Sequence, residues 1–426
     1  MNDKSLKAPA EGKCLCGAGF KSRRFFTLIL AAGLMACSTI RAQNTSPLDT
    51  APGGSTALLP GAKGTPEADG RPAVSHPKKA KPNERGAEQQ AILDQEMASL
   101  PKTKALKVSG NQLVTLEGAK VWLQGVNVVP LAWSPTGEGQ VLWSIHVAID
   151  DWKANVIRLP VQDSFWFGKG RGAVRGNNQE AYREIVDQAV RLAAAKGAYL
   201  ALDLHRFLTP DDSCIAFWKD AAARYKDNPA VLFDVFNEPH DTSWDVWRDG
   251  GPVEIKQKDG TSQAVQGVGM QALAKAVRST GAKNVIIAGG LDYAYDLTGI
   301  LKGYALDDLG GHGIMYATHF YNWHKGWNEH FMAVAEKYPI IVGETGADTK
   351  KMNFLPADIQ EDPYTWAPDA IAFIQKHRLN WTAWSFHTRA TPVMLVNMDD
   401  YQPTPFWGAF VKDALAGKPF EMKKER

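Results

Sequence analysis

The chain has 426 residues, 44% of them hydrophobic and 10% aromatic, which predicts one large globular domain or two to three small ones. Its net charge is +2, but residues 1–42 contain seven Lys or Arg and two Asp or Glu, so the remainder carries −3. The basic excess belongs to the N-terminal segment, and the charge pattern gives no reason to expect nucleic-acid binding.

Residues 1–42 have the pattern of an export signal peptide. A basic stretch precedes an uncharged run at residues 25–36, which is too short to span a bilayer. Residues 22–26 resemble a twin-arginine signal. Residues 34–37 resemble a lipoprotein box, which would place a lipid anchor on Cys37, whereas residues 40–42 would serve ordinary signal peptidase. We therefore expect an exported protein that is extracellular or periplasmic, with lipid anchoring at the cell surface as one alternative.

Residues 43–90 are predicted to form a disordered linker. They contain thirteen Pro or Gly and no Phe, Trp or Tyr, so they cannot bury enough apolar surface to offset the entropy of ordering. Cys14 and Cys16 are lost with the signal peptide, which leaves Cys214 and, in a lipoprotein, Cys37. We therefore expect no intramolecular disulfide.

Residues 91–426 are predicted to form one catalytic domain, because all fourteen Trp lie between Trp122 and Trp407. Residues 106–123 alternate around two turns and predict a short β-meander. Strands then alternate with helices, which predicts a (β/α)₈ barrel, since the glycine-rich turn of a doubly wound sheet is missing after the first strand. The expected strands are 121–126, 156–161, 199–204, 231–236, 285–288, 314–318, 340–342 and 381–384, and the expected helices are 180–196, 214–226, 267–280, 328–337, 368–377 and 406–416.

Polar residues follow several of these strands. The apolar run 231–236 stops at Asn237-Glu238-Pro239, and a second run stops at Glu344. Two carboxylates at the carboxyl ends of two barrel strands could attack a sugar acetal from opposite sides. Either glutamate alone could instead cap a helix or pair with an arginine, but the other strand ends also carry polar or aromatic residues, which favours catalysis. These are Arg158, His205, His319, Tyr321 and Trp384.

This set of residues, in barrel order, resembles the cellulase family of retaining glycosidases, glycoside hydrolase family 5. The resemblance runs from about residue 106 to residue 415 and includes the meander, which closes the barrel floor in that family. It implies that Glu238 is the general acid/base, that Glu344 is the nucleophile and that Asn237 holds the sugar 2-hydroxyl group. It also implies a cis peptide bond between Trp384 and Ser385.

The two carboxyl groups need different neighbours, which explains the supporting residues. A nucleophile must stay ionised, so Arg158 and the Tyr321 hydroxyl are expected beside Glu344. The acid must stay protonated, and the negative charge of Glu344 would raise the pKa of Glu238. The resemblance further implies that His319 tunes the Glu238 proton, that His205 bonds substrate or Arg158, and that Trp384 offers a face to the sugar.

Other residues have two interpretations. Trp133, Trp166, Trp323 and Trp327 follow strands and could stack on further sugars as outer subsites, or simply pack. His205 and His319 could also be core histidines or metal ligands, but the nearest carboxylates already have catalytic positions, so we expect no metal and no cofactor. Asp203 and Asp234 are expected to be structural, Trp218 and Trp407 to lie in the core, and His240 has no assigned role.

The sequence thus predicts an exported endo-β-glycanase that hydrolyses β-linked glucan with retention of configuration. Retention requires carboxyl groups about 5–5.5 Å apart. An exo-acting β-glucosidase or mannanase on the same barrel is the alternative within the class, and a non-catalytic glycan-binding surface protein is the alternative outside it. We expect a monomer whose partner is a polysaccharide or oligosaccharide.

Overall fold

The computed structural model describes residues 82–169, 178–256, 261–353 and 355–426. The predicted signal peptide, Cys37 and most of the predicted linker lie outside these residues. Helix α1 (Pro82–Met97) begins inside the linker range, so the prediction of disorder is wrong for residues 82–90. This helix is ordered by tertiary contacts that composition does not reveal, since Leu93 is buried and Glu96 bonds Lys196 of a barrel helix.

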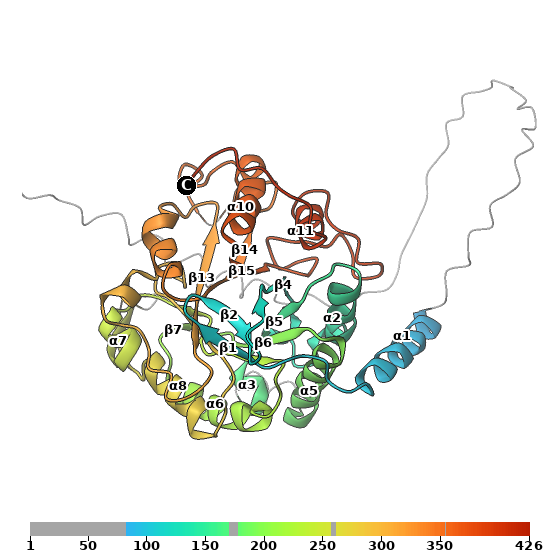
Figure 1. Ribbon diagram of the computed structural model, residues 1–426, viewed down its shortest axis with the longest axis horizontal. Coiled ribbons are helices and arrows are strands. Elements are labelled where there is room, and N and C mark those ends of the chain that lie inside the picture. Colours follow the sequence, from blue (N-terminus) through green and yellow to red (C-terminus); the bar gives the residue numbers. More distant parts are fainter. Residues whose placement is uncertain (1–81, 170–177, 257–260, 354) are drawn as a thin grey trace, which may run out of the picture. The chain divides into compact units, whose positions relative to one another are not determined.

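Eight parallel strands close into a barrel, which confirms the predicted (β/α)₈ fold (Figure 1). Most of their residues are buried on both faces, as expected of strands covered by helices outside and by side chains inside. In barrel order the strands are β4 (Gln124–Asn127), β5 (Val156–Val161), β6 (Tyr199–Leu204), β8 (Val231–Asp234), β12 (Ile286–Gly289), β13 (Ile314–Tyr321), β14 (Ile340–Gly346) and β15 (Asn380–Ala383).

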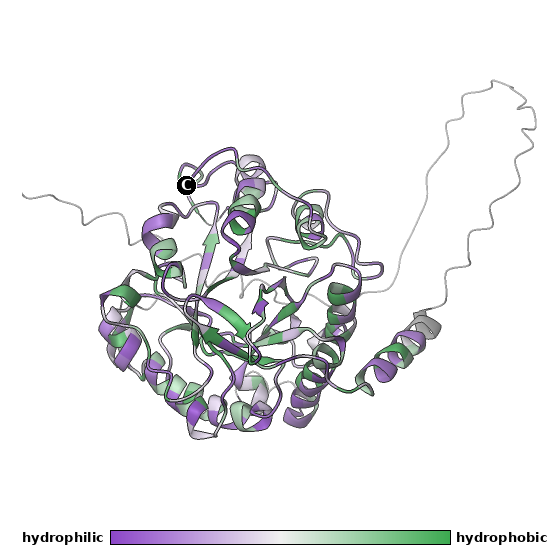
Figure 2. Cartoon of the chain, viewed as in Figure 1, coloured by the Kyte–Doolittle hydropathy of each residue, from purple (hydrophilic) through white to green (hydrophobic). Residues whose placement is uncertain are grey.

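Helices surround this barrel, and Figure 2 shows hydrophilic residues along their outer sides. Side chains of Asn178, Asp211 and Asp362 cap three of them by accepting backbone N–H groups of the first turn. The helices are α2 (Val141–Asp150), α5 (Gln179–Lys196), α6 (Asp212–Tyr225), α8 (Met270–Ser279), α10 (Pro363–His377) and α11 (Trp407–Leu415), with the 3₁₀-helix η4 (Thr298–Lys302), the π-helix η5 (Asn328–Met332) and α9 (Ala333–Ala335) between β12 and β14.

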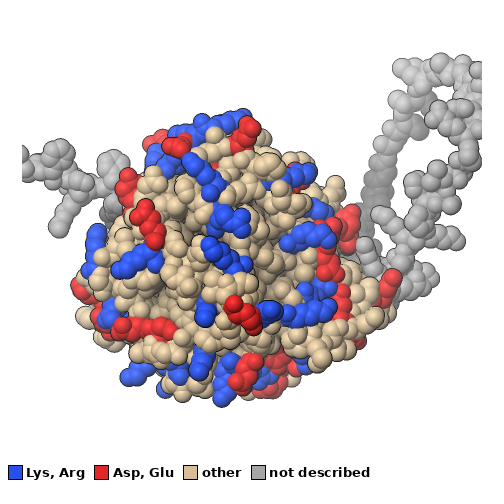
Figure 3. All heavy atoms as spheres, in the orientation of Figure 1, with Lys and Arg blue, Asp and Glu red and all other residues tan. Residues whose placement is uncertain are grey.

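The predicted meander is present as the antiparallel strands β1 (Leu106–Ser109), β2 (Gln112–Thr115) and β3 (Lys120–Val121). Leu106 and Leu113 pack with residues at the amino ends of the barrel strands, such as Met315, in a second buried cluster. The meander therefore closes the floor of the barrel. On this face of the molecule Figure 3 shows acidic and basic side chains interspersed at the rim.

Several short elements lie in the loops that leave the carboxyl ends of the strands, where barrel enzymes carry their function. They were not predicted, and the helix expected from residue 267 begins only at Met270, because a β-hairpin precedes it. None of the described helices is long and apolar enough to cross a membrane. These elements are η2 (Pro130–Ala132), η3 (Gly137–Gly139), α3 (Asp163–Trp166), β7 (Phe207–Leu208), β9 (Glu238–Pro239), α7 (Trp244–Asp249), β10 (Gly251–Lys256) and β11 (Ser262–Gly267).

Candidate active site

Arg158, on β5, lies at the centre of a buried polar network and is only 1% exposed. It donates four hydrogen bonds and pairs with a fifth oxygen, that of Asp203, so the planar guanidinium has one fixed orientation. Burial alone would lower the pKa of Arg158, but the surrounding carboxylates raise it and keep the side chain charged. The partners are Asp234 Oδ2 (2.8 Å from Nε), Asn127 Oδ1 and Glu344 Oε1 (3.0 and 2.9 Å from one terminal nitrogen), and Asn237 Oδ1 and Asp203 Oδ2 (2.8 and 3.1 Å from the other).

Two of these partners were expected to be merely structural, and one was missed. Asp203 and Asp234 are buried and hold the guanidinium from the side away from Glu344. Asn127 ends β4, the first barrel strand, and its amide also donates to the Gly343 carbonyl. The rule that found the other residues, a polar side chain at a strand's carboxyl end, would also have found Asn127.

Glu344 is aimed into the site by an irregularity in β14. The pairing of β13 with β14 shifts between Thr318 and His319, so His319 lies opposite Glu344 and Gly343 is the extra residue. A Cβ on Gly343 would lie 2.7 Å from His319 Nε2, so only glycine fits this close approach. Glu344 then accepts from Arg158 at 2.9 Å and from the Tyr321 hydroxyl at 2.8 Å.

Glu238 faces Glu344 across His319. The His319 Nδ1 atom is 3.0 Å from Glu238 Oε1 and 3.9 Å from Glu344 Oε2. One carboxylate oxygen of each glutamate and a ring nitrogen of His319 all lie within 4.8 Å of one another. The fold thus brings together the carboxyl groups of Glu238 and Glu344, which are more than 100 residues apart in the sequence.

The surroundings of the two carboxyl groups differ. Burial raises the pKa of Glu238 well above its ordinary value, and the negative charge of Glu344 raises it further. Burial also raises the pKa of Glu344, but Arg158 and the hydrogen bond from Tyr321 oppose that rise. Burial lowers the pKa of His319 well below its ordinary value, so this imidazole is neutral. Glu344 therefore ionises first, while Glu238 keeps its proton.

His205 and Trp384 form one wall of the site. His205 Nδ1 is 2.8 Å from Asp203 Oδ2, and Asp203 in turn pairs with Arg158, so of the two expected partners the bond to substrate stays a prediction and Arg158 is reached through this carboxylate. The Trp384 indole lies parallel to the His205 ring, at 9° and 5.7 Å between centroids. The Trp384–Ser385 peptide bond is cis, as expected. Trp407, buried in α11, donates its indole N–H to the Trp384 carbonyl at 2.7 Å.

Two of the four candidate outer-subsite tryptophans are core residues instead. Trp166 is 0% exposed and donates to Asp220 at 2.6 Å, because α3 turns its indole toward α6. Trp327 is also 0% exposed, at the start of η5, and packs between Phe320 and Phe373. Neither can stack on a sugar, so both predictions are wrong.

Trp133 and Trp323 are partly exposed, and their roles as outer subsites stay predictions. The Trp133 indole N–H donates to Glu138 at 2.8 Å. The Trp323 ring lies parallel to Tyr321, at 9° and 4.8 Å between centroids, and so extends the aromatic surface beside Glu344.

Two groups of described residues have the ligand types and spacing for a metal ion. One is Glu238, His319 and Glu344, where the Arg158 guanidinium already supplies positive charge to Glu344. The other is Glu96, His146 and Asp150, where the Lys196 ammonium lies 2.6 Å from Glu96 and 2.7 Å from Asp150. A protein cation thus occupies or borders each group, and the chemistry of the site needs no metal.

Comparisons with known proteins agree with this geometry. Residues 114–390 match the family model "Cellulase (glycosyl hydrolase family 5)". Endoglucanase A of Butyrivibrio fibrisolvens is 30% identical over 253 residues, which span 57% of this chain but only 52% of that protein. Cellulase CelDZ1 of Thermoanaerobacterium sp. is 24% identical, over 67% of this chain and 70% of its own length.

A solved structure shares the fold. The β-glucanase SdGluc5_26A of Saccharophagus degradans is 22% identical, with a TM-score of 0.60 over 75% of this chain and 95% of its own. The family model covers well over half of the chain and includes every polar residue of the network around Arg158 and Glu238. The chain therefore belongs to glycosyl hydrolase family 5, the cellulase family.

Proposed function

We propose that this protein is an exported endo-β-glycanase that hydrolyses β-linked glucan by double displacement with retention of configuration. Glu238 gives its proton to the leaving glycosidic oxygen while the Glu344 carboxylate bonds to the anomeric carbon. Glu238 then takes a proton from the water that displaces Glu344. Each carboxyl group has the surroundings for its step, since Glu344 has Arg158 and Tyr321 as partners and Glu238 is protonated by burial and by the neighbouring anion.

The observation that carries the proposal is the approach of the two carboxyl groups, whose nearest oxygens lie within 4.8 Å. Retaining glycosidases hold these groups about 5–5.5 Å apart, whereas inverting ones need about 6.5–9.5 Å to admit a water. The short separation supports direct attack by Glu344.

Asn237 supports the same mechanism. Arg158 holds its Oδ1 at 2.8 Å, which fixes the amide, and Nδ2 is buried without a hydrogen-bond partner among the described residues. An amide donor beside the anomeric carbon suits the sugar 2-hydroxyl, a contact that strengthens in the transition state.

A β-1,4-glucan is the substrate we propose, because the curated relatives include endoglucanases and a cellulase. An exo-acting β-glucosidase or a mannanase on the same barrel would use the same two glutamates. A glycan-binding protein would need neither, so the complete pair argues for an enzyme.

Azide rescue tests the assignment with an aryl β-cellobioside. Glu344→Ala should lose glycosyl-enzyme formation and, with azide, give an inverted glycosyl azide. Glu238→Ala should still release the activated aryl group, and azide should speed its second step and give a retained product. Swapped products would reverse the two roles. Wild-type protein that bound glucan without releasing sugar would instead be the glycan-binding protein.

We also propose export, which rests on the pattern of residues 1–42. Mass analysis of protein made in a bacterial host would find the first mature residue at position 37 or at position 43. Lipid labelling that depends on Cys37 would establish the anchored form, and an intact N-terminus retained in the cytoplasm would contradict both.

A further inference from the structure

Glu238 lies beyond the barrel sheet, at the start of the two-residue strand β9. This strand pairs in parallel with β7, in the loop after β6, so that Glu238 lies opposite Phe207. The Glu238 N–H donates to the Arg206 carbonyl at 3.1 Å. The backbone that carries the acid/base is therefore held by a loop from a neighbouring strand.

The β7 strand itself has a strained backbone. Leu208 has a φ of 76°, in the left-handed region, which is uncommon for residues other than glycine. The Leu208 carbonyl accepts the His240 N–H at 3.0 Å, so this loop bonds the chain both at Glu238 and two residues after it. Strained conformations persist where the surrounding structure enforces them. We therefore looked for what anchors β7 to the rest of the molecule.

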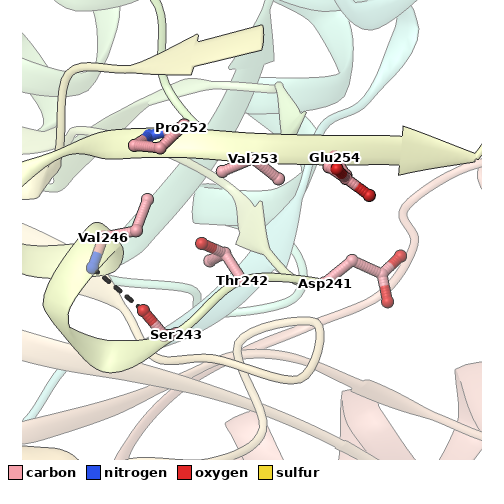
Figure 4. Close-up of a pocket in the computed structure, with 7 residues that line it drawn as sticks. All are labelled: Asp241, Thr242, Ser243, Val246, Pro252, Val253 and Glu254. Carbon is pink, nitrogen blue, oxygen red and sulfur yellow. Dashed lines mark hydrogen bonds between the residues drawn. The ribbon is translucent and has the colours of Figure 1, made fainter. Parts of the chain in front are cut away.

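On its other side, the chain that carries Glu238 continues along a hollow of about 550 Å³ (Figure 4). Residues 241–243 lie across this hollow from Val253 and Glu254 of the β10–β11 hairpin. The hairpin thus leaves a space beside this part of the loop. The Tyr293 N–H adds a hydrogen bond to the Pro239 carbonyl at 3.1 Å, but the bond to the N–H of the acid/base itself comes from the loop that contains β7.

The Arg206 side chain anchors that loop. One terminal nitrogen donates to Asp163 Oδ2 at 2.7 Å and to Ser213 Oγ at 3.1 Å, and the other donates to Asp211 Oδ2 at 2.8 Å. Asp163 begins α3, and Asp211 is the N-cap of α6. The guanidinium therefore ties the loop after β6 to two helices, while the carbonyl of the same residue holds Glu238.

The partners of Arg206 are also bonded to one another. The Ser213 hydroxyl lies 2.8 Å from Asp163 Oδ2 and 2.6 Å from Asp211 Oδ1, and the Ser213 N–H donates to Asp211 Oδ1 at 2.9 Å. Asp163 is only 7% exposed. Removing the guanidinium would leave this buried carboxylate without its cation, which is costly, so the loop would have to shift.

We propose that Arg206 is a positioning residue for the acid/base, and that it acts by fixing the backbone of Glu238. This inference rests on the proposed function, because it assumes that Glu238 gives a proton to the leaving oxygen. A misplacement of about 1 Å at such a group can cost roughly 100-fold in rate. Glu344 should be unaffected, because Arg158 and Tyr321 hold it from other strands.

Two substrates separate an effect on Glu238 from a general loss of structure. Cellooligosaccharides need a proton on the leaving oxygen, whereas a dinitrophenyl β-cellobioside does not. Arg206→Gln should lower kcat/KM on cellooligosaccharides about tenfold, which is part of the roughly 100- to 10,000-fold that general acid–base catalysis contributes. It should lower kcat/KM on the dinitrophenyl substrate less than about twofold. Arg206→Lys, which keeps the charge without the planar fork, should lose less.

The second chemical step gives an independent readout. With the dinitrophenyl leaving group this step limits turnover, and it needs Glu238 as a base, so kcat should fall in Arg206→Gln. Azide attacks the glycosyl-enzyme without a base. It should therefore bring kcat of Arg206→Gln back toward the wild-type value, while changing that of wild type much less.

Asp163→Asn alters a partner of Arg206 on another element and should show the same selective loss. Added to Arg206→Gln it should have little further effect, because both changes release the same loop. Arg278→Gln is the matched control. The Arg278 side chain is 6% exposed and lies 2.6 Å from the Asp308 carboxylate, but it is in the last turn of α8, before β12. Its losses should be equal on the two substrates.

Equal losses on the two substrates in folded Arg206→Gln would assign the residue to stability and overturn the inference, as would unchanged kinetics. Melting temperatures identify variants that do not fold, and Arg206→Lys and Asp163→Asn give the readout if Arg206→Gln does not fold. If wild-type protein cleaved neither substrate, the proposed function itself would fail, and this inference would fail with it.

Discussion

Arg158 is the residue of the site that tolerates substitution least, because its guanidinium donates four hydrogen bonds and forms a further ion pair with Asp203. Lysine has the same charge but only three donors on a compact head, so Arg158→Lys would leave buried carboxylates underpaired. We expect kcat/KM on cellooligosaccharides to fall at least about 100-fold, roughly 2.7 kcal/mol of transition-state stabilisation.

The control for that variant is Arg224→Lys. Arg224 also bonds a carboxylate, that of Asp187, but its side chain is 37% exposed. The Arg224→Lys variant should retain wild-type kinetics, because exposed ion pairs contribute little to the free energy of folding and this one lies outside the site. Near-normal kcat/KM in Arg158→Lys would show that the guanidinium does not position Glu344.

The pH dependence of activity follows from the two carboxyl groups. Glu344 must be ionised, and burial raises its pKa, so activity should fall as pH drops through a value above that of an ordinary glutamate. Glu238 must be protonated, and its pKa is raised further, so activity should fall again as pH rises through that value. The profile of kcat/KM should therefore be bell-shaped.

Glu238→Gln assigns the alkaline limb. On cellooligosaccharides, whose leaving group does need the proton, the slow residual activity of this variant should keep the acidic limb of the kcat/KM profile and lose the alkaline one that wild type shows. An alkaline limb that persisted unchanged in Glu238→Gln would assign it to another group and contradict the role of Glu238.

At the scale of elements, apolar runs predicted the barrel strands well because strands buried on both faces have few polar interruptions. The polar residues that end those runs predicted most of the site. Burial could not be predicted for Trp166 and Trp327, since a tryptophan in a loop can turn either way and only its neighbours decide. Helix α1 was missed because tertiary contacts order it, whereas the β10–β11 hairpin was missed although its strands pair with each other and Asp259-Gly260 between them is a hairpin-turn sequence.

The loop after β4 is joined to the loop after β15 through Glu138. Gly137, Glu138 and Gly139 all have positive φ, and this turn directs the Glu138 carboxylate to three donors. The donors are Trp133 Nε1 at 2.8 Å, an Arg389 guanidinium nitrogen at 2.6 Å and His387 Nε2 at 3.3 Å. His387 Nε2 carries the proton because the other ring nitrogen, Nδ1, accepts the backbone N–H of Arg389.

Glu138 should therefore position the Trp133 indole as a sugar platform. Glu138→Ala should lower kcat/KM for long cellooligosaccharides by about tenfold, roughly 1.4 kcal/mol, and affect the shortest substrates much less. In a Trp133→Ala background the same change should have little further effect, because its target is gone. Additive losses in the double variant would show that Glu138 acts without Trp133.

At the scale of the whole molecule, stability rests on burial, since a large apolar cluster fills the barrel and its helix layer and a second one closes the floor. The floor cluster joins the meander to six barrel strands, β5, β6, β8, β12, β13 and β14, so the amino end of the domain is fixed to residues more than 200 positions away. Among the described residues no disulfide adds to this, and Cys214 is a buried free thiol.

The state of Cys214 gives a whole-molecule prediction. Burial raises the pKa of this thiol to about 12, and its Sγ lies 3.6 Å from Asp211, so almost no thiolate exists at neutral pH. An aromatic disulfide reagent should find no reactive thiol in the native mature protein and one after unfolding, since a lipidated Cys37 would carry a thioether. Reductant should leave the melting temperature unchanged, whereas loss of a disulfide worth about 2–4 kcal/mol would lower it by several degrees. A reductant-dependent melting temperature would show that cysteines pair, within or between chains, and that burial alone does not account for the stability of the barrel.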